Sequence, residues 1–181
     1  QGLSGAHDVL LRNDGDAFSD VSEEVGLRAA APTYGLGVVF GDIDDDGDPD
    51  VFVANDSAPN YLFRNDLSPG GDRSLREVGV EARVAFSAEG TAQAGMGVAY
   101  GDFDDDGDRD LFVTHFEDDY NTLYRNDGAG LIAVASHELG LGQVGVPWLA
   151  FGTCFLDADN DGDLDLAVGN GHVYPQIRHL G

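Results

Sequence analysis

Several features that are common in proteins are scarce in this 181-residue sequence. No stretch approaches the roughly 18 consecutive apolar residues that a membrane-spanning helix requires, so we expect a soluble chain without direct membrane insertion. The only cysteine, Cys154, excludes an intrachain disulfide framework, and its apolar neighbours predict a small core residue. The first ten residues lack a basic segment followed by an apolar run, so a signal peptide is either absent or already removed.

Basic residues are scarce as well. The chain has nine, all of them arginine, against 34 acidic residues, and its formal charge is −25. Half of the acidity is local, because 17 acidic residues lie within residues 42–50, 102–110 and 157–165. Three bound divalent cations would add six positive charges and leave −19. That charge still repels nucleic acid and anionic membranes, which disfavours a nucleic-acid partner.

The three acidic segments share one pattern, Asp-x-Asp-x-Asp-Gly-x-x-Asp, whose positions we number from the first aspartate. Another glycine stands five residues before each first aspartate, and an apolar triplet (VFV, LFV or LAV) follows each last one. The sequences NYLFRND at 60–66 and NTLYRND at 121–127 follow the first two loops, and DVLLRND at 8–14 precedes them. The chain therefore consists of repeats, with 60 and then 55 residues between successive first aspartates.

The repeats predict an all-β fold. Short apolar strands alternate with Gly, Asn and Asp turns, and the repeat length falls near the range of propeller blades. The runs GVVFGD at 37–42 and GVAYGD at 97–102 are apolar at successive positions, which predicts strands that are buried on both faces. We expect each repeat to form a small antiparallel sheet, with the acidic loop as the turn between two inner strands.

The loops have the chemistry of calcium sites. Ca²⁺ binds about 6 to 8 oxygen ligands at roughly 2.3–2.6 Å, and closely spaced aspartates on a tight turn supply such ligands. No histidine or cysteine stands at a ligand position, which argues against zinc and copper, while Mg²⁺ demands stricter octahedral geometry. An EF-hand is excluded, because its position 12 carries a bidentate glutamate and these loops have valine there. The sequence predicts about three calcium ions, one in each loop.

Individual loop positions have different expected roles. Glycine at position 6 permits the sharp turn that aims positions 1, 3 and 5 inward. Position 9 is expected to close the site with its carboxylate, and position 7 to contribute its backbone carbonyl. Position 4, which is Asp45, Asp105 or Asn160, is expected to face solvent or to support the ligands indirectly.

Three segments resemble the FG-GAP or VCBS-type repeats of integrin α-chain propellers and of bacterial secreted propeller proteins: GDIDDDGDPDVFVAN at 41–55, GDFDDDGDRDLFVTH at 101–115 and LDADNDGDLDLAVGN at 156–170. YRNDGAG at 124–130 and GNGHVYPQ at 169–176 resemble the bacterial cartilage-acidic-protein-like branch. The resemblance implies an extracellular or periplasmic protein that serves in adhesion or assembly. It also implies calcium ligands at the odd positions of the loops, which are Asp42, Asp44, Asp46, Asp48, Asp50, Asp102, Asp104, Asp106, Asp108, Asp110, Asp157, Asp159, Asp161, Asp163 and Asp165.

We predict one repeat domain over residues 1–181. Its parts are the outer strands of a partial blade (1–30), a repeat with the first calcium loop (31–90), a repeat with the second (91–145) and a partial repeat with the third (146–181). Three blades fall below the range of about 4 to 8 that is typical of a closed propeller. We therefore expect an incomplete propeller or arc, which is part of a larger propeller, is completed by another chain or stacks as an open array.

Two classes of function fit this pattern. The first is a calcium-binding, non-catalytic interaction or scaffolding module, which binds other proteins or glycans, joins further blades of the same protein or forms a homo-oligomer. The second is a lyase or hydrolase that acts on a polysaccharide from a propeller scaffold.

No catalytic constellation stands out in the sequence. The five histidines do not recur in register, and His115 occupies the strand-end position of Asn55 and Asn170, which predicts a hydrogen-bonding role. Loss of turnover on substituting His115 or His172 would favour an enzyme. Trp148 is expected in the core or at an interface rather than as a platform for sugar stacking.

Overall fold

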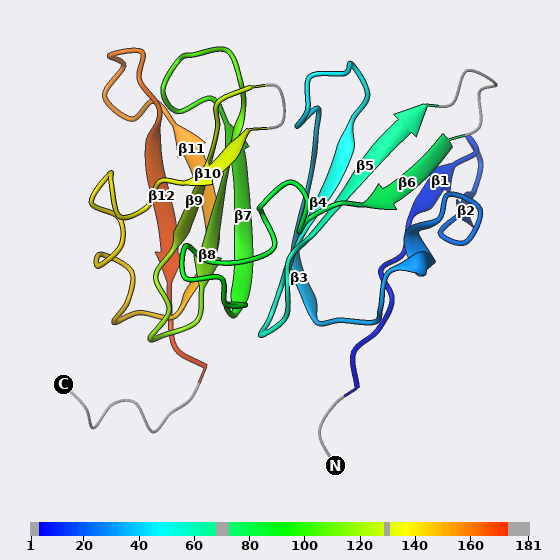
Figure 1. Ribbon diagram of the computed structural model, residues 1–181, viewed down its shortest axis with the longest axis horizontal. Coiled ribbons are helices and arrows are strands. Elements are labelled where there is room, and N and C mark those ends of the chain that lie inside the picture. Colours follow the sequence, from blue (N-terminus) through cyan, green and yellow to red (C-terminus); the bar gives the residue numbers. More distant parts are fainter. Residues whose placement is uncertain (1–3, 68–72, 129–130, 174–181) are drawn as a thin grey trace.

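The computed structural model describes residues 4–67, 73–128 and 131–173, and the regular structure in these ranges is almost entirely β (Figure 1). The strands form four antiparallel sheets, of which two are four-stranded and two are two-stranded. A single turn of 3₁₀ helix, η1 (Leu27–Ala29), is the helical structure in the described ranges, and it is far too short to cross a membrane. The predicted all-β fold is confirmed.

Each four-stranded sheet follows the chain in simple up-and-down order. The first contains β3 (Gly35–Gly41), β4 (Asp50–Asn55), β5 (Tyr61–Leu67) and β6 (Arg73–Glu77). The second contains β7 (Gly95–Gly101), β8 (Asp110–His115), β9 (Thr122–Asn126) and β10 (Ile132–Val134). The two-stranded sheets are β1 (Leu11–Asn13) with β2 (Phe18–Asp20), and β11 (Ala150–Leu156) with β12 (Asp165–Asn170).

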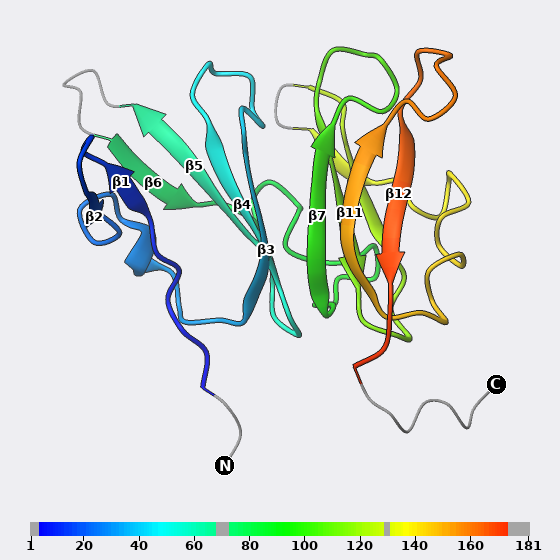
Figure 2. The ribbon, with the colours of Figure 1, turned by 180° about the vertical axis from the view of Figure 1, so that it is seen from behind.

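The sheets stand side by side like blades, with β7 lying between β3 and β11 (Figures 1 and 2). The β1–β2 hairpin and β12 lie at opposite ends of the row, so the described residues form an open arc and no closed ring. This arrangement agrees with the incomplete propeller that the repeats predict.

Apolar side chains fill the spaces between the blades. Strands β4 and β8 are buried along their whole length, because each is flanked by strands on both sides and apolar side chains pack on both of its faces. Phe52 and Val113 belong to the core between the first two four-stranded sheets. Phe112 belongs to the core between the second sheet and the β11–β12 hairpin, where it is joined by Phe155. The alternation of side chains along β8 thus assigns its two faces to two different cores.

Neighbouring blades approach at main-chain distance through glycine. A Cβ atom added to Gly37 of β3 would lie 2.6 Å from the carbonyl oxygen of Met96 in β7, and one added to Gly97 would clash with the carbonyl oxygen of Phe151 in β11. These are two of the glycines that stand five residues before a loop. The third, Gly152, has no atom within 4 Å of its added Cβ, because it faces outward from β11.

An aromatic side chain completes each contact between blades. The ring of Tyr100 lies where a Cβ on Gly41 would be, and the ring of Phe155 lies in the same way against Gly101. The second four-stranded sheet and the β11–β12 hairpin therefore each place an aromatic ring against a glycine of the preceding sheet.

Two sequence predictions about burial are wrong. Val38 and Phe40 on β3 are 62% and 53% exposed, whereas the sequence predicts that both faces of this strand are buried. No sheet among the described residues covers that face of β3. Cys154 is exposed rather than part of the core, because it lies on the open face of β11.

Candidate metal centres

Each acidic loop joins the first two strands of a blade, and all three loops lie at the same end of the molecule (Figure 1). Antiparallel pairing continues to the base of every loop, where Gly41 pairs with Asp50 and Gly101 pairs with Asp110. The prediction that the loop is the turn between two adjacent strands is confirmed. The aspartate at position 9 is consequently fixed by the sheet, whereas positions 1 to 8 form the turn.

Two positions in each loop adopt a left-handed backbone conformation. One is the glycine at position 6, with φ of 93°, 98° and 102° at Gly47, Gly107 and Gly162. The other is position 4, with φ of 59°, 56° and 63° at Asp45, Asp105 and Asn160. Asp and Asn tolerate this conformation better than most residues with a side chain. Position 4 therefore shapes the turn, a role that the sequence analysis did not assign.

Hydrogen bonds inside the loop hold the carboxylates in place. Oδ2 of the position 1 aspartate accepts the N–H of the position 6 glycine at 3.0, 3.0 and 3.1 Å in the three loops. Oδ1 of the position 5 aspartate accepts the N–H of position 7 at 2.9, 2.9 and 3.0 Å. The turns are thus closed before any ligand is considered.

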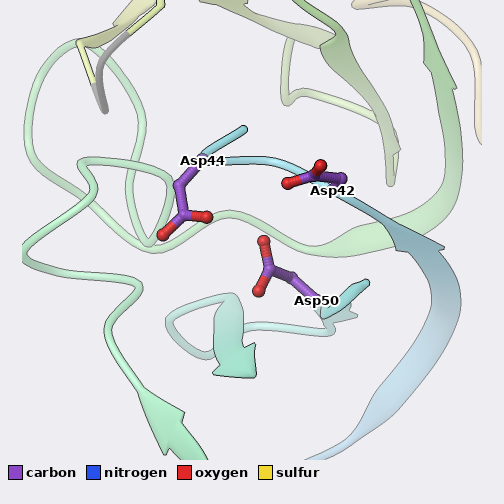
Figure 3. A group of neighbouring side chains, drawn as sticks. All are labelled: Asp42, Asp44 and Asp50. Atoms are coloured by element: carbon purple, nitrogen blue, oxygen red, sulfur yellow. The ribbon is translucent and has the colours of Figure 1, made fainter. Parts of the chain in front are cut away.

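The carboxylates at positions 1, 3 and 9 converge. In each loop these three residues offer oxygen atoms that all lie within 4.8 Å of one another, as Figure 3 shows for the first loop. The groups are Asp42, Asp44 and Asp50; Asp102, Asp104 and Asp110; and Asp157, Asp159 and Asp165. The aspartates at positions 5 and 7 lie outside these groups, so their part in ion binding stays a prediction.

Burial differs among the three groups. Asp50 is 1% exposed and Asp110 is fully buried, whereas all three carboxylates of the third group are exposed. Oδ1 of Asp42 and Oδ1 of Asp44 are buried and accept no hydrogen bond. Buried polar atoms in folded proteins nearly always have a partner, and an unpartnered one costs about 1–3 kcal/mol, more for a charged group. The protein itself provides no partner for these two oxygens, so they require one from outside the chain.

The same burial changes the titration of the position 9 carboxyls. Desolvation raises the pKa of Asp50 and of Asp110 to about 6, although each accepts two backbone N–H groups that favour the charged form. The pKa values of Asp44 and Asp104 are also raised, first by burial and then by the neighbouring position 5 carboxylate. Without a cation, these sites resist holding three negative charges together.

The protein offers little positive charge of its own at the first site. Nε of Arg64 lies 3.6 Å from Oδ2 of Asp44, but the same nitrogen lies 2.7 Å from Asp66 outside the loop. One shared guanidinium does not balance three carboxylates. The donor set contains only oxygen, which suits a hard cation such as Ca²⁺.

Asparagines of the RND sequences that follow the first two loops support the sites, a role that the sequence analysis missed. The backbone N–H groups of Asn65 and Asn126 donate to Oδ1 of Asp50 and Asp110, each at 2.9 Å. The sequence signal for this role was the RND tripeptide, which recurs after the acidic loop of each four-stranded sheet. Its spacing alone does not indicate which atom it contacts.

The histidines singled out in the sequence lie away from the loops. His115 ends β8 at the strand terminus opposite Asp110 and is fully buried. Its backbone N–H donates to Oδ1 of Asn121 at 3.0 Å, as that of Asn55 does to Asn60, whereas its ring nitrogens have no hydrogen-bond partner. Burial lowers the pKa of His115 to about 4. His172 lies 3.8 Å from Glu117, and its ring is 6.3 Å from that of Trp148. Trp148 is 52% exposed, which excludes the core position predicted as one alternative.

Comparison with known proteins supports the repeat interpretation. The sequence model of the FG-GAP-like repeat matches residues 42–113 and 102–168. The chain is 26% identical over 153 residues to cartilage acidic protein 1 of Xenopus tropicalis, and 27% identical over 154 residues to the human protein of that name. These alignments cover 84% and 85% of this chain but only 22% of each relative, so the chain spans about a fifth of their length. Because the two repeat matches together cover most of the sequence, this chain belongs to the FG-GAP-like repeat family.

Proposed function

We propose that this chain is a calcium-stabilised, non-catalytic interaction module whose three Asp loops each hold one Ca²⁺ ion. The observation that carries the proposal is the pair of buried Oδ1 atoms on Asp42 and Asp44, which lack any hydrogen-bond partner beside the buried carboxyl of Asp50. A cation between the three carboxylates would satisfy these atoms and offset their mutual repulsion.

The donor set favours calcium over other cations. Each group contains carboxylates and no histidine or cysteine, which suits a hard cation better than zinc or copper. The carbonyl of position 7 and water are expected to complete the coordination, which is flexible for Ca²⁺. A bound ion supplies charge neutralisation and fixes the turn between the first two strands of each blade.

A structural role for the ion has a calculable effect on stability. A ligand that binds only the folded chain adds about 2.7 kcal/mol to the free energy of unfolding at 100 times its dissociation constant. Occupation of several sites adds further stabilisation of this order. The exposed third site is expected to be the weakest and to need concentrations of about 10⁻⁴ to 10⁻³ M, the range of extracellular modules. We propose an extracellular or periplasmic location, where calcium at such concentrations would occupy the third site.

The test compares loop variants in millimolar calcium and in excess chelator. Asp42→Ala and Asp102→Ala each remove a position 1 carboxylate, so they should reduce the calcium-induced rise in melting temperature and change the chelated chain little. Asp105→Asn is the matched control, because the third loop carries asparagine, Asn160, at the same position. This variant should leave the calcium-induced rise in melting temperature intact. Equal destabilisation with and without calcium by the two alanine variants would contradict the proposal.

We further propose that the open face of β3 binds another blade of the same repeat type. Leu36, Val38 and Phe40 are 56%, 62% and 53% exposed on this face. The equivalent face of β7 packs on β3, where the Tyr100 ring meets Gly41. A blade with glycine at that position would receive Phe40 in the same way.

A second copy of this chain is a poorer match for that face. The open face of β11 carries Leu156 at the position of the glycine that receives the aromatic ring, so it has no space for Phe40. Light scattering on the native chain and on Leu156→Gly tests this choice. Leu156→Gly should increase self-association, and strong self-association of the native chain would instead support a homo-oligomer. Glycans and unrelated proteins stay predictions as partners.

The enzyme alternative has less support. His115 is buried and neutral, and the pair of His137 and Glu89, whose side chains lie 3.4 Å apart, is half exposed on the surface. A screen of polysaccharides in the presence of calcium tests this alternative. Turnover that is abolished by substituting His115 or His172 would favour it.

A further inference from the structure

A chain of hydrogen bonds joins the first candidate metal loop to the second. Oδ2 of Asp50 accepts the N–H of Ile43, and the carbonyl of Ile43 accepts a hydrogen bond from Nδ2 of Asn126 in the next blade, both at 2.9 Å. The N–H of Asn126 in turn donates to Oδ1 of Asp110 at 2.9 Å. All three bonds are buried, so water does not substitute for them. A carboxylate of one site is thus connected to a carboxylate of the other through two residues.

Two more contacts reinforce this connection. The hydroxyl of Tyr100, two residues before the second loop, donates to the carbonyl oxygen of Asp42 at 2.6 Å. Asp45 of the first loop also lies close to Asp108 of the second, and this proximity raises the pKa of Asp108. The two loops therefore touch through main-chain and side-chain atoms.

The side-chain bond from Asn126 to a neighbouring loop is specific to this pair of loops. Asn65, its counterpart in the first blade, donates its amide to the carbonyl of Pro49 within its own sheet at 3.1 Å. In the part of the chain that the structure describes, no side chain of the β11–β12 hairpin donates to the carbonyl of Phe103, the counterpart of Ile43. The second and third loops lack this connection within those residues.

We propose that Asn126 is a positioning residue that couples the first two calcium sites, so that an ion in the second loop raises the calcium affinity of the first. The inference rests on the proposed calcium function. An ion held by Asp110 and its neighbours fixes that carboxylate, which orders the backbone of Asn126. The Asn126 amide then holds Ile43, and Ile43 holds Asp50, before an ion enters the first loop.

The coupling works by ordering the loop in advance. Part of the entropy that the first loop must lose on binding is already lost when the second loop is occupied, which gives positive cooperativity. Repulsion between two bound cations opposes this effect, and salt screens that repulsion. Thermodynamic linkage requires the effect to be reciprocal, so an ion in the first loop raises the affinity of the second by the same factor.

The experiment measures calcium affinity at the first site by titration calorimetry at moderate ionic strength. All chains carry Asp159→Asn to disable the third site, and the second site is disabled by Asp104→Asn, which lies outside the hydrogen-bond chain. With Asn126 present, Asp104→Asn should weaken the first site about fivefold, the equivalent of one hydrogen bond of about 1 kcal/mol. With Asn126→Ala, Asp104→Asn should leave the affinity of the first site unchanged.

The Asn126 amide also donates to the carbonyl of Arg109, the residue before position 9, at 3.3 Å. Asn65→Ala is the matched control, because it removes the equivalent bond to Pro49 without touching another loop. It should keep the fivefold effect of Asp104→Asn. Two outcomes would overturn the coupling but not the proposed function. One is a calcium affinity of the first site that Asp104→Asn does not change. The other is an effect of Asp104→Asn on that affinity that is equally large with and without Asn126→Ala. No calcium binding to the unmodified chain would overturn the proposed function together with it. The comparison with native Asn126 remains decisive even where Asn126→Ala fails to fold.

Discussion

Calcium binding to the first two loops should depend strongly on pH, because protons compete for the same buried carboxyls. The pKa of Asp50 and of Asp110 is raised to about 6 by burial, so below that pH the calcium-free sites each hold a proton. The unfolded chain releases these protons near the ordinary pKa of about 3.9. The calcium-free fold is consequently favoured at low pH and loses this contribution as pH rises from about 4 to 6, whereas calcium affinity rises over the same interval.

The size of the effect follows from the pKa values. With one carboxyl of pKa about 6 in each site, proton competition is negligible at pH 7.5 and weakens each site about tenfold at about pH 5. Each ion that binds near pH 5 should displace about 0.9 proton from position 9. The raised pKa values of Asp44 and Asp104 act in the same direction and add to the effect.

Titration calorimetry in two buffers with different enthalpies of ionisation measures both the affinity and the number of protons released. A variant that retains only the third loop is the control, because its carboxylates are exposed and its calcium affinity should change less. Equal affinity at the two pH values, without proton release in either buffer, would refute the claim that buried, protonated aspartates close the first two sites.

Three further outcomes are expected. Gly97→Ala should destabilise the chain by roughly 1–3 kcal/mol in urea unfolding, because its Cβ would clash with the Phe151 carbonyl. Gly152→Ala is the control and should be close to neutral, so equal effects of the two variants would contradict the glycine contact. Phe52→Ala should cost about 3–5 kcal/mol in the same assay, since this fully buried ring fills the core between two blades, and a loss below 1 kcal/mol would argue against that core. His115→Asn should make stability less dependent on pH between about 4 and 6.5, because the buried ring stays neutral while the unfolded chain takes up a proton, a contribution of up to about 1.4 kcal/mol per pH unit. Parallel pH profiles for the native chain and His115→Asn would show that the imidazole is solvated.

Much of the fold follows from local sequence signals. The repeated loop pattern with its flanking apolar runs predicts the hairpins, and antiparallel pairing to the base of each loop confirms them. Position 9 was expected to close the site, and it does lie beside positions 1 and 3. These features depend on spacing along one chain segment, which a sequence displays directly.

The failures concern what lies opposite a residue in space. Apolar periodicity does not state whether a neighbouring blade is present, so Phe40 and Cys154 were predicted to be buried and are exposed. The reach of Asn126 across to Ile43 depends on how two blades are rotated against each other. The left-handed backbone of Asp45 depends on turn geometry that several residue types tolerate.

The glycine contacts between blades also bear on how such chains lengthen in evolution. A main-chain carbonyl meets a glycine at both interfaces, so the spacing of neighbours there does not require matched side-chain volumes. A tandem duplication that copies one blade copies both halves of the contact, and the new neighbour fits without compensating mutations. On β11 the glycine of this main-chain contact is kept as the open Gly152, whereas Leu156 replaces the other glycine, the one that receives an aromatic ring in the two preceding blades.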